Sequence, residues 1–68
     1  MNLQIEVERE DDGRWIAEVA DLPGVMAYGQ TNDQAIARVK ALALRVIADR
    51  LENGESIPAT AEAFTVAA

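Results

Sequence analysis

The chain has 68 residues, half of them hydrophobic, and its 12 acidic against 6 basic residues give a net charge of −6. It contains neither Cys nor His, which excludes disulfide bonds, thiolate metal sites and catalysis by either side chain. A surface this acidic repels phosphate backbones, so we expect no direct nucleic-acid binding, whereas a basic protein is a suitable partner.

Residues 1–68 are expected to form a single domain with a small core. A chain of this length buries only about 60% of its unfolded surface, so its stability is marginal. Because Cys is absent, disulfide bonds cannot add stability, and we expect the chain to be stabilised by association into a homo-dimer or tetramer. No apolar run approaches the roughly 20 residues that cross a bilayer. The stretch MNLQIEVERE alternates apolar and polar residues, unlike a signal peptide, so we expect a cytoplasmic location.

The first two elements are predicted to form an antiparallel hairpin. Residues 2–9 alternate apolar and polar side chains, which is typical of a half-buried strand, and residues 14–20 resume the same pattern. Between them, Asp12 and Gly13 predict a tight turn.

A second turn and a third strand follow. Pro23 fixes its own φ, and Gly24 accepts the positive φ that a type II turn requires at its third position. Residues 25–30 then predict a short strand. Gly29 inside this strand indicates a bulge or a close approach of another backbone segment.

One helix is predicted over residues 32–52, which contain neither Pro nor Gly and are rich in Ala. Thr31 and Gln34 fit a capping box at its start, and Gly54 supplies the left-handed residue expected after its end.

A fourth strand is predicted at about residues 61–66, carrying Phe64 and Val66. The fold class is therefore α+β, with the order β-β-β-α-β. A right-handed crossover places the fourth strand parallel to the first, in a mixed sheet of order 3-2-1-4 with the helix on one face. This arrangement corresponds to the first half of a ribonuclease H-like fold.

The predicted helix carries two apolar stripes. At 100° per residue, one broad stripe is suited to the core and consists of Ala35, Val39, Leu42, Ala43 and Val46, flanked by Ile36 and Ile47. A shallower stripe lies almost opposite and consists of Ala37, Ala41, Leu44, Ala48 and Leu51. Surface Ala follows from helix propensity alone, but two Leu residues seven apart make this stripe a candidate oligomer interface.

The sheet face away from the helix, with Gln4, Glu6, Ile16, Glu18 and Tyr28, is left open to water or a partner. The candidate partner-binding residues are Glu6, Glu18, Asp21 and Tyr28. A metal-dependent nuclease is the enzymatic alternative, in which Glu6, Glu8, Glu18 and Asp21 hold the metal ions. Acids that alternate with apolar residues along strands usually form a solvated face, and Asp21 suits the organisation of its own turn. We therefore expect no catalytic residues, no metal and no cofactor.

The stretch DDGRWIAEVADLPGVMAYGQTNDQAIARVKALALRVIADRLENGESIP resembles the HicB family of antitoxins. The resemblance is carried by the Asp-Gly hairpin, the Asp-Leu-Pro-Gly turn, the Gly two residues before Thr31 and the Ala-rich helix ending in Glu-Asn-Gly. It covers about residues 3–66. It implies a partial ribonuclease H-like domain without nuclease activity that binds and neutralises HicA, a small basic ribonuclease toxin.

Many members of that family also carry a C-terminal DNA-binding domain, and we expect this chain to be a member without one. The leading hypothesis is an antitoxin-like protein that covers the active site of a basic ribonuclease. The alternative is an orphan homo-oligomer of the same fold with no toxin partner.

Overall fold

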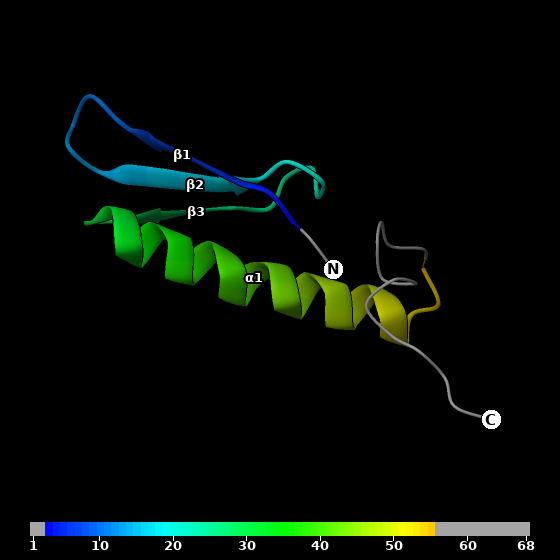
Figure 1. Ribbon diagram of the computed structural model, residues 1–68. Coiled ribbons are helices and arrows are strands. Elements are labelled where there is room, and N and C mark those ends of the chain that lie inside the picture. Colours follow the sequence, from blue (N-terminus) through cyan, green and yellow to red (C-terminus); the bar gives the residue numbers. More distant parts are fainter. Residues whose placement is uncertain (1–2, 56–68) are drawn as a thin grey trace.

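The computed structural model describes residues 3–55 of the chain. Three strands, β1 (Ile5–Arg9), β2 (Trp15–Val19) and β3 (Met26–Gly29), precede one helix, α1 (Asn32–Glu52). The strands form an antiparallel sheet in the order β1-β2-β3, and α1 crosses one face of it (Figure 1). The predicted α+β class, the three strands and the helix are confirmed, although each strand is shorter than predicted. The predicted fourth strand lies outside the described residues.

The hairpin between β1 and β2 forms at the predicted residues. The amide of Gly13 donates to the carbonyl of Glu10 at 2.9 Å, and the amide of Glu10 donates to the carbonyl of Arg14 at 2.7 Å. Gly13 has φ of +90°, which suits a three-residue loop closed by a glycine bulge. A carboxylate oxygen of Asp12 also accepts the Arg14 amide at 3.1 Å and its Nε at 2.8 Å.

The turn between β2 and β3 has the predicted form. The amide of Val25 donates to the carbonyl of Leu22 at 3.0 Å across Pro23 and Gly24, and Gly24 has φ of +86°. These are the features of a type II turn. The turn buries Leu22 completely between sheet and helix, so it also contributes to the core.

Both ends of α1 are capped. Thr31 Oγ1 accepts the amide of Gln34 at 3.0 Å, as predicted, but Gln34 Oε1 accepts the amide of Gln30 at 2.6 Å rather than that of Thr31. At the other end, the amides of Gly54 and Glu55 donate to the carbonyls of Leu51 and Arg50. This pair of bonds is a Schellman motif, with Gly54 at φ of +73°.

The core lies between the helix and the strands. Its buried members are Ala17, Val19, Leu22, Val25, Ala35, Val39, Ala43 and Ile47. The helix residues among them recur every four positions, so the buried face of α1 is turned towards Ile47 relative to the predicted stripe. Leu42 and Val46 are only half-buried against that core, whereas Ile47, predicted to flank the stripe, is 5% exposed. No helix among residues 3–55 is both long and apolar enough to span a membrane.

Candidate functional site

The face of the sheet away from α1 is built from cross-strand rows. Each strand alternates its side chains between the two faces, so Trp15, Ala17 and Val19 point to the helix while Ile16 and Glu18 point away. The register then aligns Glu8 with Ile16 and Tyr28, and Glu6 with Glu18 and Met26. We call these six residues and Glu10 the open face.

The β1 side of the open face is strongly acidic. Glu6 lies directly opposite Glu18, and like charges directly opposite on neighbouring strands destabilise a sheet. Glu6, Glu8, Glu10 and Glu18 together surround Ile16 in a depression of about 160 Å³. Among residues 3–55 the only ion pair joins Arg14 to Asp12, so no basic side chain neutralises these four carboxylates there.

The β3 side of the open face is apolar. Met26 and Tyr28 are each 41% exposed and lie side by side with the β2 residues on this face. The Arg14 guanidinium lies 4.5 Å from the centre of the Tyr28 ring, a cation–π distance. The Tyr28 carbonyl accepts a hydrogen bond from Arg38 at 3.0 Å, which ties β3 to the helix. The open face thus combines an aromatic anchor with a negative field.

The predicted partner-binding residues are only partly brought together. Glu6, Glu18 and Tyr28 lie on the open face, as expected. Asp21 instead follows β2, where its Oδ2 accepts the amide of Gln4 at 3.4 Å, so it helps to close the end of the β1–β2 pair. Its expected role within its own turn is therefore wrong, because it bonds a strand rather than the turn. Ile16 was also expected on this face and lies there, whereas Met26 was missed, although the alternation of β3 could have indicated it.

The carboxylates nominated for a nuclease do not converge. Within the part of the chain that the structure describes, no three acidic side chains are grouped so that they could hold a metal ion. The nuclease alternative receives no support from this arrangement.

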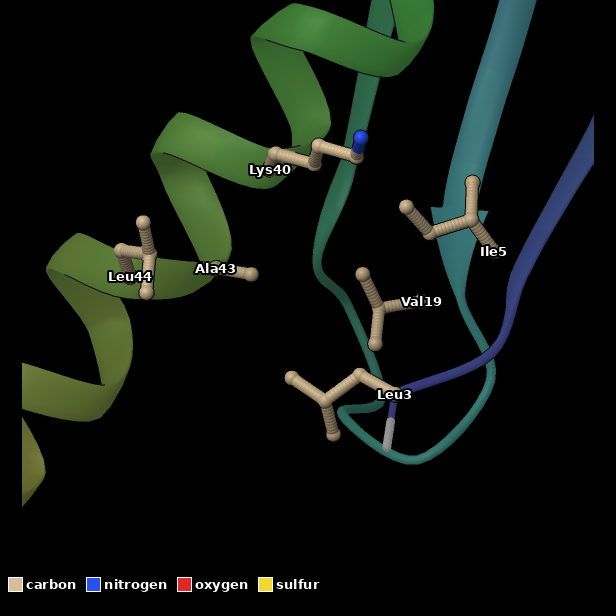
Figure 2. Close-up of a pocket in the computed structure, with 6 residues that line it drawn as sticks. All are labelled: Leu3, Ile5, Val19, Lys40, Ala43 and Leu44. Carbon is tan, nitrogen blue, oxygen red and sulfur yellow. The ribbon is translucent and has the colours of Figure 1, made fainter. Parts of the chain in front are cut away.

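A second surface lies beside the edge of β1 that faces away from β2. There, an apolar groove of about 240 Å³ runs between the strand and α1, lined by Leu3, Ile5, Val19, Lys40, Ala43 and Leu44 (Figure 2). Leu3 and Ile5 point into it from the strand side, and Ala43 and Leu44 border it from the helix.

The backbone of β1 makes this edge available for pairing. The amide of Ala20 donates to the Gln4 carbonyl, and the amide of Glu10 donates to the Arg14 carbonyl, so the even-numbered residues bond to β2. Because hydrogen-bonding directions alternate along an antiparallel strand, Ile5, Val7 and Arg9 direct their N–H and C=O groups outward. An added strand would therefore find both hydrogen-bonding partners and a place for its apolar side chains.

The candidate oligomer interface is exposed throughout. All five residues of the shallow helix stripe are exposed, with Leu44 at 60% and Leu51 at 47%.

Comparison with known proteins identifies no relative: no family model, no curated protein and no solved structure matches this chain.

Proposed function

We propose that this protein is an antitoxin-like binding module that neutralises a small basic ribonuclease of the HicA type by covering its active site. The open face is the proposed contact surface. The proposal joins the sequence resemblance to the HicB family with the charge and shape of that face.

The unneutralised pair Glu6 and Glu18 is the observation that carries the proposal. A sheet gains nothing in stability from two carboxylates facing each other, and no described base compensates them. A cationic partner would relieve this repulsion and be attracted from a distance, which speeds encounter at low salt. Beside the acids, Tyr28 and Met26 offer the large exposed side chains that often dominate binding energy at an interface.

Inhibition of the ribonuclease tests the proposal directly. The protein is purified with the small basic ribonuclease that it captures from its native lysate at low salt, and RNA cleavage is measured at increasing protein concentration. We expect inhibition that weakens as salt rises, and that weakens strongly in Glu6→Gln and Glu18→Gln. Glu55→Gln removes the same charge from an exposed position just after the helix and should inhibit like the unaltered protein. Equal loss in all three variants, or no inhibition at all, would contradict a role for the open face.

We also propose that a fourth strand completes the sheet. The result would be a mixed sheet of order 3-2-1-4 in a partial ribonuclease H-like fold. The outward-directed groups of Ile5, Val7 and Arg9 and the adjoining groove support a fourth strand from residues 61–66 beside β1. Residues 56–60 connect Glu55 to this segment, and five extended residues span about 16–18 Å, which is the reach available for the return from the helix to β1. Phe64 or Val66 would then fill the groove.

The second candidate function is that of an orphan homo-oligomer with a structural or regulatory role. Exposure of Leu44 and Leu51 on one face of the helix favours self-association. Self-association and toxin binding use different faces of the molecule, so they can operate together.

A further inference from the structure

The outer stripe of α1, formed by Ala37, Ala41, Leu44, Ala48 and Leu51, is exposed along its whole length, and only Leu44 at its border also lines the groove beside β1. The buried residues of the helix, such as Val39 and Ala43, lie on its opposite side. Figure 1 shows that, among the residues it colours, no segment covers the helix on the side away from the sheet. The two leucines therefore present their side chains to solvent.

The spacing of the outer stripe is that of a helix–helix seam. Its members are separated by four, three, four and three residues, which is the a/d pattern of a heptad repeat. An amphipathic surface helix needs only one apolar face, and α1 already uses that face for the core. The regular spacing of the second face indicates a helical partner.

We propose that this partner is a second copy of the chain, whose α1 packs antiparallel against the first through the outer stripe. With the two-fold axis near the level of residue 46, Leu44 lies against the partner's Ala48, and Ala41 lies against the partner's Leu51. Each layer then joins one large to one small side chain, which fills space without steric conflict. The pairing is isologous, as in most dimers.

The charges beside the stripe select the antiparallel orientation. In a parallel pair, Lys40 would lie next to the partner's Arg45 on both sides of the seam, where charges of the same sign repel. In the antiparallel pair, Arg38 lies next to the partner's Glu52 on both sides. Near the axis, Arg45 lies next to the partner's Arg45. The negative charge of Asp49, one turn away on each helix, offsets the repulsion between these two cations. The helix dipoles also oppose each other favourably in this orientation.

The proposed dimer has a consequence for binding. Two helices packed back to back place the two sheets outermost, so both open faces point away from the dimer axis. Each dimer would offer two separate acidic surfaces. Dimerisation itself does not depend on the proposed toxin and can be tested without it.

Oligomeric state tests the proposal, with a matched control variant. Static light scattering on the intact chain should give twice the mass of 7.4 kDa, and Leu44→Glu should reduce it to a single chain. Met26→Glu likewise replaces an exposed apolar side chain by a carboxylate, but on the open face, and should leave the dimer intact. The proposal would be overturned by a monomeric unaltered chain, or by a dimer that Met26→Glu dissociates and Leu44→Glu does not. Circular dichroism of each variant separates loss of association from loss of folding.

Orientation is tested by crosslinking, which the absence of native Cys makes simple. Ala41→Cys and Leu51→Cys are prepared as separate proteins. Each is oxidised by itself, and an equal mixture of the two is oxidised in parallel. In the antiparallel register, like positions lie about 15 Å apart along the axis, too far for a disulfide. We expect a covalent dimer only in the mixture, with one chain of each kind by mass. Covalent dimers in either protein alone would instead show a parallel pair and overturn the antiparallel arrangement.

Discussion

Gly29, the last residue of β3, packs directly against the backbone of Ala35 in the first turn of α1. A Cβ on Gly29 would lie 2.9 Å from the Ala35 Cα and closer still to its amide nitrogen. Real side chains do not approach so closely, and backbone atoms cannot rotate away. This contact sets how near the helix lies to the sheet.

Gly29→Ala should therefore destabilise the protein by about 1–3 kcal/mol, as overpacking does. The measurement is thermal unfolding, combined with hydrogen exchange at the Ala35 amide, which donates to the Thr31 carbonyl at 3.0 Å. We expect a lower Tm and faster exchange at Ala35. Gly24→Ala is the control, because no atom lies within 4 Å of its added Cβ. It should lower Tm through backbone strain at φ of +86° while leaving the Ala35 amide unchanged.

The local elements were predictable because their signals are local. Alternation identified the first two strands, a short apolar run indicated the third, and the turn at Pro23 and Gly24 follows from residues adjacent in sequence. The helix bounds were predicted as Asn32–Glu52 because the cap residues Thr31 and Gly54 mark both ends. The sequence also indicated that Gly29 marks a bulge or a close approach, without naming its partner.

Long-range relationships were less accessible to sequence reasoning. Asp21 bonds the Gln4 amide 17 positions away, a pairing that depends on the register of β1 and β2. The opposition of Glu6 and Glu18 depends on that register too, since a slip of β1 by one residue would move Glu6 to the other face, away from Glu18. Which acids meet is therefore a property of strand pairing and not of composition.

The like-charge pair predicts a stabilising substitution. Glu18→Lys should place a cation opposite Glu6 and raise stability by a few tenths to about 1 kcal/mol, measured as a higher Tm. Glu8→Lys makes the same charge change opposite Ile16 and should stabilise less. Under the proposed function, Glu18→Lys should also weaken binding of the basic ribonuclease. A Tm that falls in Glu18→Lys would contradict the view that this pair is retained for binding at a cost in stability.

The hairpin carboxylate predicts a pH effect. The Arg14 main-chain N–H donates to Asp12 and holds the pKa of that carboxyl below its usual value of 3.8, assisted by the Arg14 guanidinium and opposed by slight desolvation. A lowered folded-state pKa means that the stabilisation is present above the unfolded value and is lost as pH falls through the folded one. An NMR titration of Asp12 should therefore give a midpoint below 3.8.

Arg14→Ala separates the two contributions of Arg14 to that pKa. The variant keeps the main-chain donor and loses the guanidinium, so the Asp12 midpoint should move only part of the way back towards 3.8. A midpoint at or above 3.8 in the unaltered protein would show that the hairpin contact does not form in solution.

The proposed fourth strand predicts a pattern of amide exchange along β1. The amides of Ile5, Val7 and Arg9 point away from β2, so at a free edge they should exchange almost as fast as in an unfolded chain. If residues 61–66 pair with this edge, Ile5 and Val7 should instead be protected. The amides of Glu6 and Glu8 bond to β2 in either case and provide the internal reference.

Thr65→Pro tests whether the chain's own segment provides that protection, since Pro lacks the N–H that a ladder requires. Exchange at Ile5 and Val7 should become faster in this variant, while Glu6 and Glu8 stay protected. If protection of Ile5 and Val7 rises with protein concentration and is unchanged in Thr65→Pro, the β1 edge pairs with another copy of the chain. Rapid exchange at Ile5 and Val7 in the unaltered protein would leave the edge unpaired and reduce the sheet to the three antiparallel strands β1, β2 and β3.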